Sequence, residues 1–189
     1  MSLQEDIENN LMKNYEKYYR FAYGYVRNQE DALDIIQDSA CKIIKNQGKL
    51  RNNQQIESWI YSIIRNTSLD FLKKRKREFP MEDEVLYEMA GTQEMDETDD
   101  TFYDIVRCLN EEEYTVVTLR YVEEKKLDEI AKISGEKVST VKSRLYRALG
   151  KLKAGMSGER IAGQNKAEKK LLNTLTLLDM DLIWLVQIW

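Results

Sequence analysis

The stretch TVKSRLYRALGKLK runs from Thr140 to Lys153 and combines an apolar periodicity with a high positive charge. Between Lys137 and Lys153 there are six basic residues and no acidic one. Wound at about 100° per residue, the stretch predicts a helix with cations and hydroxyl groups opposite an apolar stripe. Such a helix packs by one face and offers the other to an anion, of which nucleic acid is the first candidate. The stripe consists of Val141, Leu145, Ala148, Leu149 and Leu152.

The preceding stretch KLDEIAKISGEKV completes a helix-turn-helix pattern. Apolar spacing predicts a short amphipathic helix around Ile130, and Ser134 and Gly135 are expected to end it. Ser139 is expected to cap the second helix by accepting a hydrogen bond from an amide of its first turn. In a helix-turn-helix the second helix enters the major groove, where lysine and arginine contact guanine or phosphate. DNA binding is therefore the favoured interpretation, and a solvated amphipathic helix in a bundle is the alternative.

Composition predicts an all-α chain and argues against an enzyme. The 189 residues suffice for one or two small domains, and one proline and eight glycines are too few for a loop-rich β protein. The chain has no histidine, so it lacks the commonest general base and metal ligand. It also shows no nucleophile motif and no glycine-rich phosphate loop. We therefore expect no catalytic residue, no metal and no cofactor.

The two cysteines, Cys41 and Cys108, lie far apart in the sequence and form no CxxC pair. We expect neither a zinc site nor a disulfide, and each cysteine is expected to be a small buried apolar residue. The first twenty residues contain no apolar run typical of a signal peptide, which predicts a cytoplasmic protein.

Shifts in composition divide the chain into four expected parts. Ten acidic residues and no basic one lie between Met81 and Asp104, which is typical of a linker. The parts are a basic helical domain over residues 1–79, the acidic linker over 80–103, the helix-turn-helix domain over 104–157 and a C-terminal extension over 158–189.

The extension ends in an apolar segment whose role stays open. From Leu171 to Trp189, 13 of 19 residues are apolar, but Asp179 and Asp181 interrupt them. Two carboxylates make a membrane span costly, so we do not expect one. Packing against the protein, docking on a partner or a membrane, and the absence of any role are the alternatives.

Three segments of the chain resemble a bacterial RNA polymerase sigma factor of the extracytoplasmic-function class. They are EDALDIIQDSACKII, SWIYSIIRNTSLDFLKKRKR and LNEEEYTVVTLRYVEEKKLDEIAKISGEKVSTVKSRLYRALGKLK. The resemblance covers the chain from Leu11 to Lys153, with the blocks in the order typical of that class. It implies two small helical domains that bind RNA polymerase core, direct it to specific promoters and help to melt the DNA. The catalytic chemistry then belongs to the polymerase core.

The resemblance assigns roles to three groups of residues. Recognition of the minus-thirty-five element is implied for Lys137, Ser139, Thr140, Lys142, Ser143, Arg144 and Arg147. Contact with the melted minus-ten element is implied for Asn52, Asn53, Trp59, Arg65, Asn66, Lys73, Lys74, Arg75 and Arg77. Docking on the clamp helices of the largest polymerase subunit is implied for Asp31, Asp34, Ile35, Gln37 and Asp38.

Several of these residues also have a purely structural interpretation. Trp59, at helical spacing with isoleucines, suits a core indole as well as a surface on which a base stacks. The acidic residues from Asp31 to Asp38 also suit the positive end of a helix dipole. The cations from Lys73 to Arg77 are expected to be solvated in the free protein. The acidic linker suits either a phosphate mimic inside the polymerase or a plain solvated spacer.

The resemblance also implies partners. These are RNA polymerase core, promoter DNA and an anti-sigma factor, and the free protein is expected to be a monomer. A formal charge of −4 fits weak DNA binding by the free protein. The alternative from another class is a stand-alone helix-turn-helix repressor or activator, which requires a symmetric dimer that binds DNA without polymerase.

Overall fold

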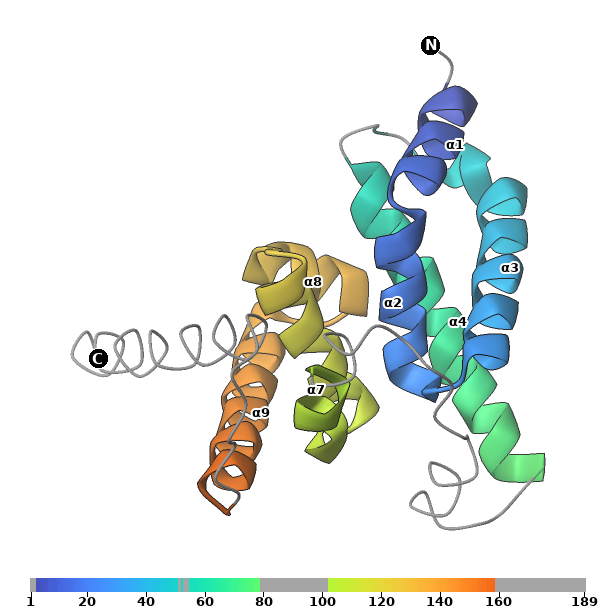
Figure 1. Cartoon of the computed structure of the whole chain (residues 1–189). Coiled ribbons are helices and arrows are strands. Elements are labelled where there is room, and N and C mark those ends of the chain that lie inside the picture. Colours follow the sequence, from blue (N-terminus) through green and yellow to red (C-terminus); the bar gives the residue numbers. More distant parts are fainter. Residues whose placement is uncertain (1–2, 51, 53–54, 79–101, 159–189) are drawn as a thin grey trace.

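The structure, a computed structural model, describes residues 3–50, 52, 55–78 and 102–158. Every regular element in these ranges is a helix, which confirms the predicted all-α class. The helices form two units that lie side by side (Figure 1). None of the described helices is long and apolar enough to cross a membrane. The C-terminal extension beyond Gly158 lies outside the described residues, as does the acidic linker apart from Phe102 and Tyr103.

The first unit contains α1 (Leu3–Lys13), α2 (Tyr15–Val26), α3 (Gln29–Asn46), the short 3-10 helix η1 (Gln47–Lys49) and α4 (Ile56–Glu78). Arg27 follows α2 in the left-handed conformation, with φ 53°, and its amide donates to the carbonyl oxygen of Tyr23. Asn28 then caps α3, because its side chain accepts a hydrogen bond from the Asp31 amide. The chain therefore reverses between α2 and α3 within two residues.

The core of the first unit is rich in aromatic side chains. α2 packs against α3 and α4, and Tyr18 and Phe21 meet Tyr61 edge-on at ring-centroid distances of 5.0 and 5.1 Å. Ile35 of α3 is 1% exposed and belongs to this core. Edge-on aromatic pairs add to the energy of apolar burial, so they fix how α2 lies on α4.

The second unit contains η3 (Val106–Cys108), α7 (Glu111–Val117), the π-helical turn η4 (Thr118–Val122), α8 (Leu127–Ser134) and α9 (Val138–Gly158). α8 ends at Gly135, whose φ of 69° is a left-handed conformation that favours glycine. α9 follows after a short turn, which confirms the predicted helix-turn-helix. The predicted apolar stripe of α9 is buried along its length, with no member more than 8% exposed.

The start of α9 differs from the prediction. The helix begins at Val138, and the carbonyl oxygen of Lys137 accepts hydrogen bonds from the amides of Thr140 and Val141. Ser139 therefore lies inside the first turn and is exposed, so it is not the capping residue. The helix therefore begins two residues earlier than the capping preference of serine indicated.

Both cysteines are exposed, which corrects the prediction that they are buried. Cys41 lies on the side of α3 opposite the buried face that Ile35 and Ile43 form. Cys108 ends η3, and its thiol donates a long hydrogen bond of 3.7 Å to the carbonyl oxygen of Ile105. Their positions on the helices, and not the apolar character of the thiol, decide their exposure.

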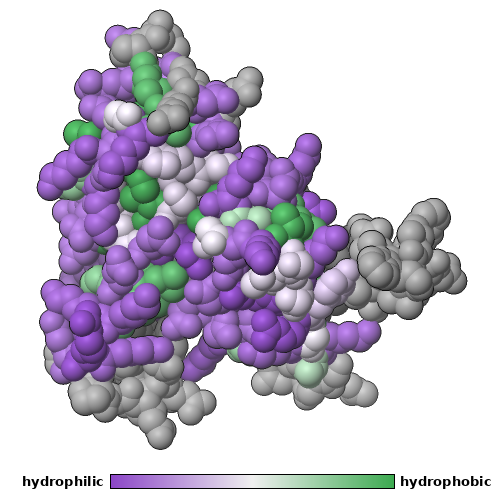
Figure 2. All heavy atoms as spheres, turned by 180° about the vertical axis from the view of Figure 1, so that it is seen from behind, coloured by the Kyte–Doolittle hydropathy of each residue, from purple (hydrophilic) through white to green (hydrophobic). Residues whose placement is uncertain are grey.

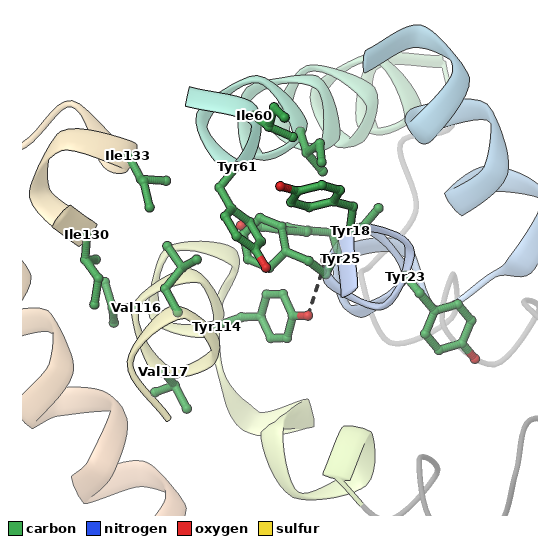
Figure 3. Close-up of a cluster of buried hydrophobic side chains, with 14 of the residues drawn as sticks. Tyr18, Tyr23, Tyr25, Ile60, Tyr61, Tyr114, Val116, Val117, Ile130 and Ile133 are labelled. Carbon is green, nitrogen blue, oxygen red and sulfur yellow. Dashed lines mark hydrogen bonds between the residues drawn. The ribbon is translucent and has the colours of Figure 1, made fainter. Parts of the chain in front are cut away.

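The two units share one continuous core, with Tyr114 of α7 at the contact. Its ring meets those of Phe21 and Tyr25 at 6.2 and 4.9 Å, and its hydroxyl donates to the Phe21 carbonyl oxygen at 3.3 Å (Figure 3). The approach needs Gly24, because a Cβ built there lies 1.8 Å from the Tyr114 hydroxyl oxygen. Burial raises the pKa of Tyr114 to about 12, so this hydroxyl stays protonated at neutral pH.

A buried hydrogen bond joins the same two helices. The hydroxyls of Tyr25 and Thr115 lie 2.6 Å apart inside the core, and burial raises the pKa of Tyr25. Beside them α8 packs against α4. Ile130 and Ile133 of α8 face the part of α4 that carries Tyr61 (Figure 3). We call the contact of Gly24 and Tyr25 with Tyr114 and Thr115 the inter-unit seam.

Replacing Gly24 with Ala is expected to destabilise the folded chain, although alanine is the better helix former. The exchange gains about 1 kcal/mol of helix propensity in α2. Overpacking of the buried Tyr114 ring costs about 1–3 kcal/mol and outweighs this gain. We therefore expect a net loss of up to about 2 kcal/mol, measured as a lower midpoint of urea unfolding.

Gly150→Ala is the matched control, because nothing lies within 4 Å of a Cβ built at Gly150 in α9. This variant keeps the propensity gain and should raise the unfolding midpoint. If Gly24→Ala raised the midpoint as much as Gly150→Ala does, the seam would not depend on a glycine.

Candidate nucleic-acid and polymerase-binding surfaces

Among the described residues, the outer face of α9 is open to solvent, and the opposite stripe packs against α7 and α8. Thr140 is half-buried there, and its carbonyl oxygen accepts a hydrogen bond from the Ser143 hydroxyl at 3.0 Å. Tyr146, which the predicted set omits, is 43% exposed on the same helix. The structure thus places most of the predicted upstream-element residues along α9. The exposed residues of the predicted set are Lys137, Ser139, Lys142, Ser143 and Arg147.

Arg144 differs from the rest of the predicted upstream set. Its side chain is only 15% exposed, and Nη1 pairs with the Glu136 carboxylate inside the helix-turn-helix. The same nitrogen lies 3.1 Å from Oε2 of Glu112 in α7. In this structure Arg144 therefore ties α9 to α7 and does not lie on the open face.

The predicted melted-element residues in the middle of α4 divide between core and surface. Trp59 is partly buried and packs against the hydrophobic core. The Arg65 side chain is 8% exposed, with Nη2 donating to Glu112 at 2.7 Å and Nη1 to Oδ1 of Asn66 at 3.1 Å. Asn66 itself is exposed. The guanidinium of Arg65 is thus already occupied by a carboxylate of the second unit.

The end of α4 presents the predicted cationic run. Lys73, Lys74 and Arg77 are exposed, as expected for solvated side chains. Arg75 instead donates to Oδ2 of Asp31 in α3 at 2.6 Å, with each side chain 25% exposed. Partial burial raises the pKa of Asp31, and the Arg75 guanidinium opposes this. One predicted DNA contact and one predicted polymerase contact therefore bind each other.

The loop before α4 carries the last two predicted melted-element residues. Asn52 is exposed, and its carbonyl oxygen accepts a hydrogen bond from the Gln55 amide at 3.0 Å. Asn53 lies outside the described residues.

α3 places Asp34, Gln37 and Asp38 on its exposed side. Ile35 does not accompany them, since one further residue turns the helix by about 100° and carries its side chain into the core. This corrects the prediction that Ile35 contacts the polymerase. Its role in this structure is to hold α3 against α2 and α4.

An apolar strip runs along α3 beside these polar side chains. Leu33 and Ile44 are 40% and 59% exposed, and Ile36 and Ala40 lie between them at helical spacing. Ile36 and Ala40 also line an apolar pocket of about 160 Å³ with Met12 and other residues of α1, α2 and α4. On the face that Figure 2 shows, hydrophobic residues reach a mainly hydrophilic surface as small patches. The sequence shows the helical spacing of these apolar residues, but it does not show that the strip they form is exposed.

Sequence reasoning missed two glutamates at the start of α7. Glu112 bonds Arg65 and Arg144 at once, and Glu113, with a side chain 4% exposed, accepts from Lys151 of α9 at 2.7 Å. Glu112 lies 47 positions after Arg65, so no local pattern connects them. Acidic residues at a helix start are explained locally by the dipole, which conceals this second role.

The chain matches two family models and several characterised relatives. The model for Sigma-70 region 2 matches residues 11–78, and that for Sigma-70, region 4 matches residues 100–152. RNA polymerase sigma factor SigV of Bacillus subtilis is 42% identical over 147 residues, covering 76% of this chain and 87% of SigV. ECF RNA polymerase sigma factor SigW of the same organism is 26% identical over 151 residues, covering 70% and 79%.

Two solved structures share the fold. The sigma factor RpoE, in a co-crystal with the anti-sigma factor NepR from Bartonella quintana, has a TM-score of 0.68 at 23% identity, covering 79% of this chain and 96% of that chain. CnrH, in complex with the cytosolic domain of CnrY, has a TM-score of 0.61 at 17% identity, covering 82% and 90%. The matched regions coincide with the two units, and together with the relation to SigV they show that the chain belongs to the extracytoplasmic-function sigma factors of bacterial RNA polymerase.

Proposed function

We propose that this chain directs RNA polymerase core to two-part promoters. In this proposal α9 binds the upstream element, α4 binds the melted element and α3 binds the polymerase. A sigma factor catalyses no reaction itself, so phosphoryl transfer belongs to the core enzyme. Membership in this family also decides against the alternative of a stand-alone repressor or activator.

The observation that carries the proposal is the outer face of α9. Lys137, Lys142 and Arg147 are exposed there beside hydroxyl groups, and the helix contributes no acidic residue up to Lys153. Lysines suit phosphate as point charges, and arginine suits the paired acceptors of guanine in the major groove. This face supports contact with duplex DNA even though the chain as a whole is acidic.

Docking on the polymerase is supported by two kinds of surface that lie side by side on α3. Asp34 and Asp38 supply an exposed acidic edge, and the strip with Leu33 and Ile44 supplies apolar area next to it. A partner helix that lies in a groove needs apolar anchors for affinity and complementary charges for orientation. We assign this face to the clamp helices of the largest polymerase subunit.

The exposed cations at the end of α4 support a path for the melted strand. Lys73, Lys74 and Arg77 are exposed and can follow a backbone of phosphates. Their own contacts are weak: Lys74 lies 3.9 Å from Glu78, and Arg77 Nε donates to the carbonyl oxygen of Lys73 at 3.3 Å. The relative RpoE is bound to an anti-sigma factor in its structure. We propose that a protein of this kind also holds the present chain, which is monomeric when free.

The proposal is tested by transcription with purified bacterial core polymerase and a library of randomised promoter fragments. New transcripts that appear only with this protein, and that share a two-part upstream motif, are the expected result. Absence of such transcripts, together with specific retention of duplexes by the protein alone, would sink the proposal.

Arg147→Ala is expected to weaken use of the selected promoters. If Arg147 reads a base, the loss is about 1–3 kcal/mol and the upstream preference relaxes at one position. Promoter output is measured on the selected motif and on its single-base variants. Arg107→Ala, which removes an exposed cation of η3 outside the helix-turn-helix, is the control. An equal loss on every upstream sequence would reduce Arg147 to a phosphate contact.

Asp34→Lys is expected to lower affinity for core polymerase about tenfold or more, because it reverses one charge at the edge of the docking face. The measurement is competition with labelled wild-type protein for a limited amount of core. Asp104→Lys makes the same charge change at an exposed site of the second unit and should compete normally. Normal competition by both variants would remove Asp34 from the docking face.

A further inference from the structure

One carboxylate oxygen joins two arginines that the proposed function separates. Oε2 of Glu112 lies 2.7 Å from Nη2 of Arg65 and 3.1 Å from Nη1 of Arg144. Arg65 belongs to the helix proposed for the melted element, and Arg144 belongs to the helix proposed for the upstream element. Glu112 stands at the start of α7, between these two helices.

Both arginines are withdrawn from solvent by this arrangement. The side chains of Arg65 and Arg144 are 8% and 15% exposed, whereas Glu112 is 36% exposed. The Nε of Arg65 is buried and has no hydrogen-bond partner among the described residues. A guanidinium held in this way cannot form a bidentate contact with phosphate or guanine until the carboxylate leaves.

The shared oxygen also sets how far apart the two arginines can be. Since both donors bond one atom, their nitrogens lie within about 6 Å of each other. Elements centred near minus ten and minus thirty-five are about 25 base pairs apart, which is roughly 85 Å of duplex at 3.4 Å per base pair. The paired arrangement is therefore incompatible with simultaneous contact of both elements.

The inter-unit seam holds Glu112 in this position. Thr115, one turn further along α7, hydrogen-bonds Tyr25 of α2, and Tyr114 fits against Gly24. At the edge of the same contact Lys125 pairs with Glu57 of α4 at 2.8 Å. The pairing of Glu112 therefore belongs to one packed interface and depends on the two units lying together.

We propose that Glu112 is an autoinhibitory latch, which holds the free protein closed by occupying Arg65 and Arg144 together. This rests on the proposed function, because it assumes that these arginines face different promoter elements. Opening of the seam separates Arg65 in the first unit from Glu112 in the second, while Glu112 and Glu136 stay beside Arg144 until phosphate replaces them. Binding to polymerase and the competence of α4 for DNA are therefore coupled. The competing groups are the phosphates, which replace Glu112 as the anionic partner.

Cys41 and Cys108 provide the first test, because they are exposed and lie in different units. Spin labels on these native thiols report the distance between the units by pulsed electron resonance. Glu112→Gln in the full chain is expected to shift the distance distribution to longer values and broaden it. A wild-type distribution in Glu112→Gln would overturn the proposal.

Two variants make this comparison specific. Glu136→Gln removes the same charge and the other carboxylate of Arg144, but it acts within the second unit and should leave the distance unchanged. Gly24→Ala is the positive control, because its added Cβ clashes with Tyr114 and opens the seam without a change of charge. This variant should lengthen the distance between the labels. An equal shift in Glu136→Gln and Glu112→Gln would reduce the effect to net charge.

The wild-type chain supplies a second test that needs no variant. Phenylglyoxal modifies accessible guanidinium groups, and peptide mass spectrometry reports the rate at each position. Arg65 and Arg144 are expected to react several-fold more slowly than the exposed Arg147, and equal rates would overturn the latch. Both tests read conformation and not transcription, so their failure is distinguishable from failure of the proposed function.

Discussion

The fit of Tyr114 against Gly24 is the contact on which the arrangement of both units depends. Any side chain at Gly24 would occupy the space of the Tyr114 hydroxyl, so α2 and α7 approach closely only because Gly24 has none. The hydrogen bond between Tyr25 and Thr115 then fixes the rotation of α7 within the same buried contact. Once α7 is fixed, its glutamates have defined neighbours on α4 and α9. Close packing thus positions α7, and the ion pairs of its glutamates depend on that position.

The two kinds of contact differ in strength and in reversibility. The seam is apolar and buried, so it contributes through area and close packing. Ion pairs near the surface contribute about 0–1 kcal/mol each, and an anion of similar geometry can replace the carboxylate at little cost. Glu112 is partly exposed, but its arginine partners are only 8% and 15% exposed, so its two pairs are screened less than surface pairs are. A protein built in this way closes by packing and by charge together, and its anionic partners can still be exchanged.

The distribution of charge reconciles an acidic chain with binding to DNA. A formal charge of −4 describes the whole molecule, but the outer face of α9 carries only cations and hydroxyls among its polar side chains. The exposed side of α3, in the first unit, carries Asp34 and Asp38 beside an apolar strip. Two separate contacts of moderate strength then reinforce each other when one polymerase carries both, because the second binding step becomes intramolecular.

The sequence by itself determined the helices, the helix-turn-helix and the outward face of α9. These follow from a period of 3.6 residues and from a glycine that accepts a left-handed turn, and both are local properties. Only the tertiary structure decided that Ile35 is buried, that both cysteines are exposed and that Glu112 holds two distant arginines. Periodicity shows which side of a helix packs, but the element that it packs against depends on contacts between residues far apart in the chain.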